Sequence, residues 1–281
     1  MGWAARREAP PAPRLDRATW RELLAGVWPI AGNALAVTAS LRAGQVILMS
    51  LRGPVEVGLL AAASRVVEAF SVLPEALMIA IYPLMASLHG SDGDRLLATA
   101  RRSTRYLVAV VGLPVIVCVA AGPELMRLLF GEAFANAGTA LALLSGMAVL
   151  SATGTVLQNL LIAIHHERIL YWDTLAFALV NVAVCFPLVA AYGYVGAAAA
   201  MVATSLASQV VLLFIPSVRT QVAACLGGAL SPAAATLLSL ACAILPLPTG
   251  TRFAAAAIVY TASLWSLGAL RRTDLTMFRR G

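Results

Sequence analysis

Three ionisable residues and one tyrosine share one face of the mainly apolar stretch between residues 55 and 88, which has Glu56 at its outer end. Arg65 and Glu68 are three positions apart, and Glu75 and Tyr82 follow at intervals of seven. At 3.6 residues per turn, these spacings place all four side chains on one side of a helix. An ionised group at the centre of a bilayer costs about 2.5–3.5 kcal/mol on insertion scales, so this face should point toward protein or water. The pattern predicts a hydrophilic cavity wall that handles a charged substrate or a coupling ion.

Other interpretations of these charges stay open. Arg65 and Glu68 could neutralise each other and hold helices together, with Glu75 near the membrane surface. Arg42, in the preceding apolar stretch, either belongs to the same cavity or extends its long side chain to the outer interface. Asp173, just inside a later stretch, is interpreted as interfacial.

Composition identifies the elements that must position these residues. Of the 281 residues, 60% are apolar and 12% are charged, and the mean hydropathy is +0.86. Soluble domains average about 45–50% apolar and about 25% charged residues. A soluble core cannot hold this much apolar surface, and a disordered chain would not carry it. The chain is therefore predicted to be a polytopic membrane protein.

Long uncharged runs predict eight membrane-spanning helices and an all-α bundle, because only helices satisfy the backbone over such runs in lipid. A membrane β-barrel would instead show strands of about ten residues with alternating polarity. The predicted spans are Leu23–Leu51, Val55–Leu88, Thr104–Gly122, Gly138–Ile164, Ile169–Ala191, Val195–Ser217, Val222–Leu245 and Phe253–Leu270.

The arginines support this count. The chain contains no lysine, and 15 of its 20 arginines fall on one predicted side of the membrane. Three fall on the other side (Arg52, Arg127 and Arg252), and Arg42 and Arg65 lie within spans. By the positive-inside rule, both termini are predicted to be cytoplasmic. Because the arginines sit between apolar runs and not on one polar face, nucleic-acid binding is excluded as an interpretation of the net charge of +7. Residues 1–22, with five arginines and three closely spaced prolines, predict a polar lead-in and not a cleaved signal peptide.

No motif predicts an enzyme, a cofactor or a metal site. Asp92-Gly93-Asp94 matches the short DxD pattern of glycosyltransferases, but it is interpreted as a turn and helix N-cap before Arg95. His165-His166 predicts a solvated loop, since neighbouring histidines point apart on a helix. The sequence has no phosphate-binding GxxxxGK[ST] motif. The cysteines lie inside apolar runs and predict small buried residues: Cys118, Cys185, Cys225 and Cys242.

Four segments resemble bacterial polysaccharide flippases of the multidrug/oligosaccharidyl-lipid/polysaccharide exporter superfamily, which also includes lipid II flippases and drug exporters. The first runs from Val57 to Glu68 (VGLLAAASRVVE), and the second is the run Ile81-Tyr82-Pro83-Leu84-Met85-Ala86. The third is Leu128–Phe134 (LLFGEAF). The fourth joins Asn181 to the run YGYVGAAAA that begins at Tyr192. They occur in the family's order and cover the chain from about Trp20 to Pro216.

The resemblance implies a transporter that flips a polyprenyl-(pyro)phosphate-linked oligosaccharide from the inner to the outer leaflet of the bacterial inner membrane. Such transporters serve the synthesis of surface polysaccharides and alternate access between two lobes. Arg65 and Arg42 would then attract the anionic phosphates. Glu68 and Glu75 would balance charge or bind a coupling cation, and Tyr82 would continue the cavity wall.

The chain departs from the family pattern in length, because the family has about twelve to fourteen helices. The motifs are similar to those of the second lobe, so residues 23–218 predict a six-helix lobe and residues 219–270 two additional membrane helices. Residues 271–281 predict a cytoplasmic tail. A single lobe would need a separate N-terminal chain or a second copy in the same orientation. A related drug or metabolite exporter and a non-transporting remnant are the alternatives.

Overall fold

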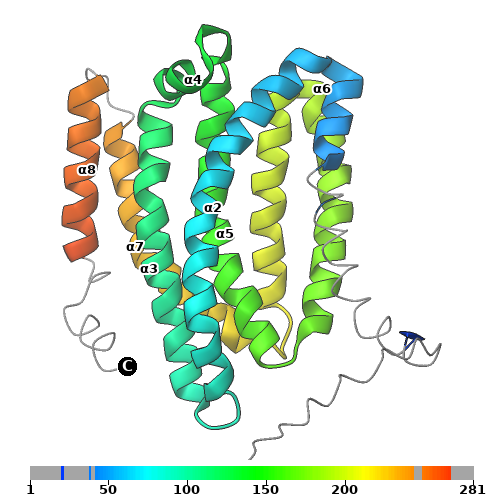
Figure 1. Cartoon of the computed structure of the whole chain (residues 1–281), viewed down its shortest axis with the longest axis vertical. Coiled ribbons are helices and arrows are strands. Elements are labelled where there is room, and N and C mark those ends of the chain that lie inside the picture. Colours follow the sequence, from blue (N-terminus) through cyan, green and yellow to red (C-terminus); the bar gives the residue numbers. More distant parts are fainter. Residues whose placement is uncertain (1–19, 22–37, 39–41, 244–248, 267–281) are drawn as a thin grey trace, which may run out of the picture.

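The structure is a computed structural model that describes residues 20–21, 38, 42–243 and 249–266, and every regular element in these ranges is helical. Residues 42–52 form a helical segment that leads into α2 (Figure 1). The elements that follow are α2 (Pro54–Leu88), α3 (Gly93–Ala120), α4 (Gly122–Phe130), the short 3-10 helix η1 (Glu132–Phe134), α5 (Ala137–Ala163), α6 (Glu167–Leu213), α7 (Arg219–Ala243) and α8 (Thr249–Ser266).

Five of these helices are long and apolar enough to cross a membrane: α2, α3, α5, α6 and the first 23 residues of α7. In α8 the apolar part is shorter and covers Ala255–Ser266. Lipid offers no partner for backbone polar groups, so long helices of this kind are what a membrane-spanning chain requires. The predicted all-helical fold is confirmed for the described residues, with five helices long and apolar enough to cross a membrane, and the number of crossings stays a prediction.

The predicted spans agree with the observed helices where the first and last residues of a helix coincide with the ends of an apolar run. α2 and α5 match within one residue at each end, whereas α3 begins eleven residues before the predicted Thr104. Apolarity marks the part of a helix that lies in lipid, but α3 extends beyond it because Asp92 caps its start. The short helices α4 and η1 were not predicted. Most of the predicted span Leu23–Leu51, residues 1–19 and the tail 271–281 lie outside the described residues.

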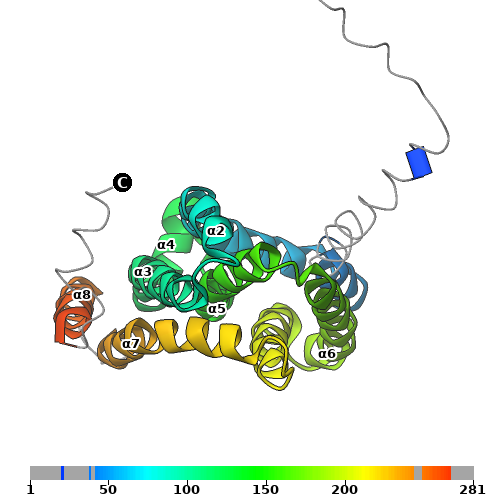
Figure 2. The same cartoon turned by 90° about the horizontal axis from the view of Figure 1, so that it is seen from below.

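α6 consists of two helices that meet at Gly193. The 47 residues of α6 are helical except at Gly193, whose φ of 60° and ψ of −136° form the kink. This conformation is accessible to glycine and strained for other residues. The two halves run side by side in both views (Figures 1 and 2). A Cβ atom on Gly196 would collide with the Leu188 carbonyl, so this glycine permits the close packing. The predicted break between the spans Ile169–Ala191 and Val195–Ser217 is confirmed.

α5 lies at the centre of the bundle and contacts α2, α3, α4, α6 and α7 (Figure 2). Its fully buried side chains include Leu141, Val156 and Leu160. α8 packs outside α3 and α7, where the Tyr260 hydroxyl donates a 2.6 Å hydrogen bond to the Ala109 carbonyl. Small residues at such contacts let helices approach closely, which is how helices associate in membranes.

The connections between helices separate to the two ends of the bundle. The turns at residues 89–92, 164–166 and 214–218 lie at one end, while α4 and the α6 turn lie at the other (Figure 1). The first end carries Arg95, Arg168 and Arg219 close to helix starts, and the second carries Arg127 in α4. These arginines lie at the ends of the bundle that the predicted sidedness of the helices requires.

Substitution of Gly193 by alanine is expected to destabilise the protein. The new Cβ atom would force a strained φ and displace the Glu56 carboxylate that lies against this glycine. The expected cost is about 1–3 kcal/mol of folding free energy, measured as a lower Tm in detergent. Gly146→Ala is the matched control, because its Cβ meets no atom within 4 Å inside α5. An equal Tm for both variants would contradict the strained-turn interpretation.

Candidate functional site

Polar side chains of the bundle line three adjoining cavities. The Arg42 cavity, of about 410 Å³, lies between the 42–52 segment, α2, α5 and α6. The Asp173 cavity, of about 260 Å³, lies between α5 and the two halves of α6. The Glu75 cavity, of about 450 Å³, lies between α2 and α5.

The Arg42 cavity combines opposite charges with hydrogen-bonding groups. Arg42 and Gln45 line it from the 42–52 segment, and the Arg42 Nη1 donates a 3.1 Å bond to the Gln45 Oε1. Glu68 lines it from α2. The remaining polar lining comes from small side chains and one buried amide: Thr38, Ser64, Ser71, Ser151 and Asn181. A guanidinium, a carboxylate and several uncharged groups can bind a phosphate and sugar hydroxyls.

Arg65 lies beside this cavity, not in its lining. Its Nη1 is 3.3 Å from the Glu68 Oε2, and the two side chains are 73% and 63% exposed in the isolated chain. Arg65, predicted to line the cavity wall, is thus paired within α2 next to it, and Glu68 of the same pair lines the cavity. The contact is open and not a dry, buried ion pair.

Glu75 and Tyr82 line the Glu75 cavity and therefore lie apart from Arg42. They face polar side chains of α5, which are Thr155, Gln158 and Asn159. The face predicted from the spacing of Arg65, Glu68, Glu75 and Tyr82 is thus divided between the exposed surface of α2 and two cavities.

A polar strip on α5 connects the three cavities and was missed in the sequence. Ser151 lines both the Arg42 and the Asp173 cavity, while Thr155 and Gln158 line both the Asp173 and the Glu75 cavity. Their spacings of four and three residues give one helix face. The helical spacing that identified the charged residues of α2 in the sequence could also have identified this uncharged strip.

Asp173, which is predicted to be interfacial, lines a cavity. Its carboxylate lines the Asp173 cavity and accepts hydrogen bonds from the Ser208 hydroxyl at 2.9 and 3.1 Å. Ser208 comes from the other half of α6, 35 residues later, so sequence spacing gave no signal for this pairing.

Arg52 and Glu56 hold the turn of α6. The Arg52 guanidinium donates to the carbonyls of Val189 and Ala190, at the end of the first half of α6. The Glu56 Oε2 accepts a 2.8 Å bond from the Tyr194 backbone N–H, at the start of the second half. A cation at a helix C-terminus and an anion at an N-terminus both complement the helix dipole. These two charges therefore have a structural role at the turn.

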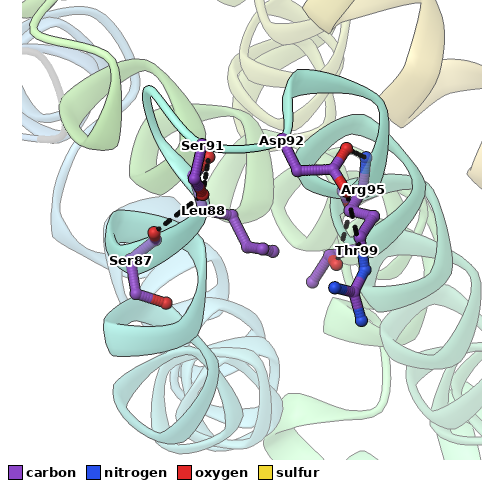
Figure 3. Close-up of polar contacts among 6 residues, drawn as sticks. All are labelled: Ser87, Leu88, Ser91, Asp92, Arg95 and Thr99. Carbon is purple, nitrogen blue, oxygen red and sulfur yellow. Dashed lines mark hydrogen bonds and ion pairs between the residues drawn. The ribbon is translucent and has the colours of Figure 1, made fainter.

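The motifs considered for catalysis have structural roles as well. Figure 3 shows Asp92 accepting a 3.0 Å bond from the Arg95 backbone N–H, which confirms the predicted N-cap of α3. His165 is an exposed turn residue with a positive φ of 59°. Cys118, Cys185 and Cys225 are buried and unpaired, whereas the Cys242 side chain lies outside the described residues. Within the described ranges, no group of three or more His, Cys, Asp or Glu side chains could hold a metal ion.

These features define a helical bundle of the membrane type, with a cavity of mixed polar and apolar lining between the 42–52 segment, α2, α5 and α6. Comparisons with protein-family models, with curated proteins and with solved structures each found no match.

A cysteine at position 151 is expected to react with a charged, water-soluble thiol reagent in membranes, since Ser151 lines two cavities. The thiolate that reacts forms in water and not in lipid, so labelling should be at least about tenfold faster than at Val110→Cys. Val110 is 52% exposed on α3 and lines none of the three cavities. Labelling is measured by mass spectrometry after the four native cysteines are replaced by alanine. Equal rates would show that the cavities exclude water.

Proposed function

We propose that this chain is one lobe of a flippase that moves a polyprenyl-(pyro)phosphate-linked oligosaccharide across the bacterial inner membrane during surface polysaccharide synthesis. The observation that supports this most directly is the Arg42 cavity, where a guanidinium and a carboxylate meet uncharged hydrogen-bonding groups. The ordered resemblance of four sequence segments to polysaccharide flippases supports the same class.

The chemistry of the cavity suits a substrate with a charged end and a sugar part. The Arg42 guanidinium offers several N–H donors to phosphate oxygens, and such charge-assisted bonds are stronger than neutral ones. Gln45, Ser64, Ser71 and Asn181 supply groups that can exchange hydrogen bonds with sugar hydroxyls. The polyprenyl chain stays in lipid, so the protein needs to enclose the polar head alone.

The size of the cavity favours a second lobe. Its volume of about 410 Å³ lies within the range of pockets for drug-sized ligands, about 300–1,000 Å³. A cavity of this volume is small for a diphosphate that carries several sugars. In a transporter built from two pseudo-symmetric lobes, the substrate lies between them and each lobe supplies one wall. The Arg42 cavity would then be half of the complete binding site.

The exposed face of α2 supplies a second argument for a partner. Arg65, Glu68 and Glu75 are exposed there together with Val72 and Ile79. Lipid contact along this face would cost about 2.5–3.5 kcal/mol for each ionised side chain. A separate N-terminal lobe or a second copy of the chain in the same orientation would cover the apolar residues and enclose the charges around water.

The proposed role is transport, with no bond made or broken by the chain. An exporter of cationic drugs would suit a cavity lined by acids alone, whereas Arg42 favours an anionic substrate. A non-transporting remnant is the remaining alternative, and the next experiment distinguishes it from a transporter.

Replacement of Arg42 by alanine is expected to reduce surface polysaccharide about tenfold or more, because a hydrogen bond to a charged group contributes about 1.5–3 kcal/mol. The polysaccharide is measured in a strain that depends on this chain, at matched expression. Arg42→Lys should retain part of the activity, since it keeps the charge and loses the planar donor group.

Arg127→Ala is the control for removal of an arginine. Arg127 forms an exposed 3.1 Å ion pair with Glu132 in the α4 region, and such pairs contribute about 0–1 kcal/mol. The Arg127→Ala variant should therefore leave the amount of surface polysaccharide unchanged. Wild-type levels in the Arg42→Ala strain would contradict the proposal and favour the remnant.

Cysteine cross-linking tests the proposed partner. Val72→Cys, at a position 61% exposed on the charged face of α2, should give a disulfide-linked or reagent-linked product in native membranes. A product of twice 29.2 kDa identifies a second copy. A product of another mass supports a separate lobe only where mass spectrometry of that product identifies a polytopic membrane protein. Leu237→Cys, 67% exposed on α7, is the control and should stay monomeric. A monomer for both variants, in membranes that still transport, would contradict the half-transporter proposal.

A further inference from the structure

Two histidines from distant parts of the sequence lie together at one end of the bundle. His89 ends α2 as its C-cap, and His165 lies in the turn between α5 and α6. Both turns are at the same end of the bundle (Figure 1). The centroids of the two imidazole rings are 5.7 Å apart, and the ring planes are inclined by 75°. The fold therefore creates a histidine pair that the spacing of residues along the sequence does not reveal.

Both imidazole rings are accessible to water and to small ions. The His165 side chain is 79% exposed, and His89 is also exposed. Within the part of the chain that the structure describes, no hydrogen bond or ion pair involves the His89 ring. An unprotonated imidazole nitrogen is both a hydrogen-bond acceptor and a common metal ligand. The His89 ring can therefore take a ligand without giving up an existing bond.

Glu167 contacts one ring nitrogen of His165 and leaves the other free. The His165 Nδ1 is 3.7 Å from the Glu167 Oε1. In metal sites, a histidine usually gives one ring N–H to a carboxylate or carbonyl and binds the ion with its other nitrogen. The contact at Nδ1 thus makes Nε2 the nitrogen that His165 can offer to an ion. Glu167 acts here as the partner of His165 and not as a third ligand, in agreement with the described residues containing no group of three ligands.

The backbone of His165 is strained. Among the described residues, His165 is the only one other than glycine with a positive φ, which is 59°. Residues in this conformation persist only where the surrounding structure holds them, and they occur often at functional sites. The residue with the strained backbone is also the one whose ring lies beside His89.

We propose that His89 and His165 together bind a divalent transition-metal ion of the Zn2+ type, with water in its remaining positions. Nitrogen ligands select such ions over Mg2+ and Ca2+, which prefer oxygen. In a tetrahedral site with metal–nitrogen distances of about 2.0–2.1 Å, the centroids of two bound imidazoles are about 5 Å apart. The observed separation of 5.7 Å is close to this value, so a small rotation of the two exposed side chains would bring a nitrogen of each to one ion.

An ion at this site would join the end of α2 to the end of α5. These two helices pack against each other, and both line the Arg42 cavity and the Glu75 cavity. The ion would therefore restrain α2 against α5 at the end of the bundle that is predicted to be cytoplasmic. The metal site does not rest on the proposed flippase function, since its test needs no transported substrate.

Isothermal titration of Zn2+ into the purified full-length chain in detergent tests the proposal, with an affinity tag that contains no histidine. The wild type should bind one Zn2+ per chain in a saturable manner. His89→Asn and His165→Asn should each weaken binding by at least about tenfold, because even residues that only support a metal ligand contribute this much. Asparagine is chosen because it tolerates the positive φ at position 165.

His166→Asn is the matched control, since His166 is the remaining histidine of the chain. It is half-buried, and its Nδ1 is 2.9 Å from the Ile164 carbonyl oxygen. This variant should bind Zn2+ as the wild type does, and Mg2+ should give no saturable binding. Every variant should elute as the same single species without metal, which separates loss of binding from loss of folding. The Tm of the wild type should rise when Zn2+ is added, and this rise should vanish in His89→Asn.

Three results would overturn the site. The first is absence of saturable Zn2+ binding to the folded wild type. The second is equal binding by the wild type and His89→Asn, which would place any Zn2+ site elsewhere in the chain. The third is loss of binding in His166→Asn with binding retained in His89→Asn, which would place the ion on the His165-His166 turn alone. Each of these results would leave the flippase proposal standing, because that proposal rests on the Arg42 cavity.

Discussion

The free-energy cost of an ionised side chain in hydrocarbon constrains how this bundle can function. α2 is apolar enough to cross a membrane, yet it carries Arg65, Glu68 and Glu75 on its exposed side. The ion pair between Arg65 and Glu68 cancels the net charge of the two side chains, but both charged groups stay on the exposed surface. Only water or another protein can make this face compatible with a membrane. The two elements that border the Arg42 cavity with charged groups, α2 and the 42–52 segment, are therefore the ones that must meet water or a partner.

Close helix packing leaves the rest of the bundle little freedom to adapt. α3 and α5 are the most buried of the long helices, whereas α2 and α6 are largely exposed. A Cβ atom on Gly228 of α7 would collide with the Arg101 carbonyl of α3, and one on Gly112 would collide with Tyr260 and Thr236. Through such contacts, α3 packs closely against α7 and α8, and none of these three helices lines the three cavities. The open side of the bundle is consequently the side that carries the polar groups.

Sequence periodicity predicted the helices well and the cavities only in part. Apolar runs located α2 and α5, because lipid solvation selects long uncharged helices. The break at Gly193 was located by a turn signal, a glycine between two tyrosines. The runs could not locate the start of α3 or the helix α4, which depend on capping and amphipathicity. Spacing along one helix found Arg65, Glu68 and Glu75. It could not find Asp173 with Ser208, or Arg52 with Val189, since these contacts join residues 35 and 137 positions apart. The first pair joins the two halves of α6, and the second joins the 42–52 segment to α6, so both exist only in the folded bundle.

The hydrogen bond from the Gln209 amide to the Leu150 carbonyl joins α6 to α5 close to the border between the Arg42 cavity and the Asp173 cavity. Leu150 is the neighbour of Ser151, and Ser151 lines both the Arg42 and the Asp173 cavity. The α5 backbone at Leu150 is thus joined to α6 directly beside the residue that both cavities share. By linkage, if an occupant of one cavity shifts α5 and so changes the affinity of the other cavity, the effect on the two affinities is the same in free energy. The uncharged strip of α5, more than the charges of α2, is therefore the element through which the two cavities would influence each other.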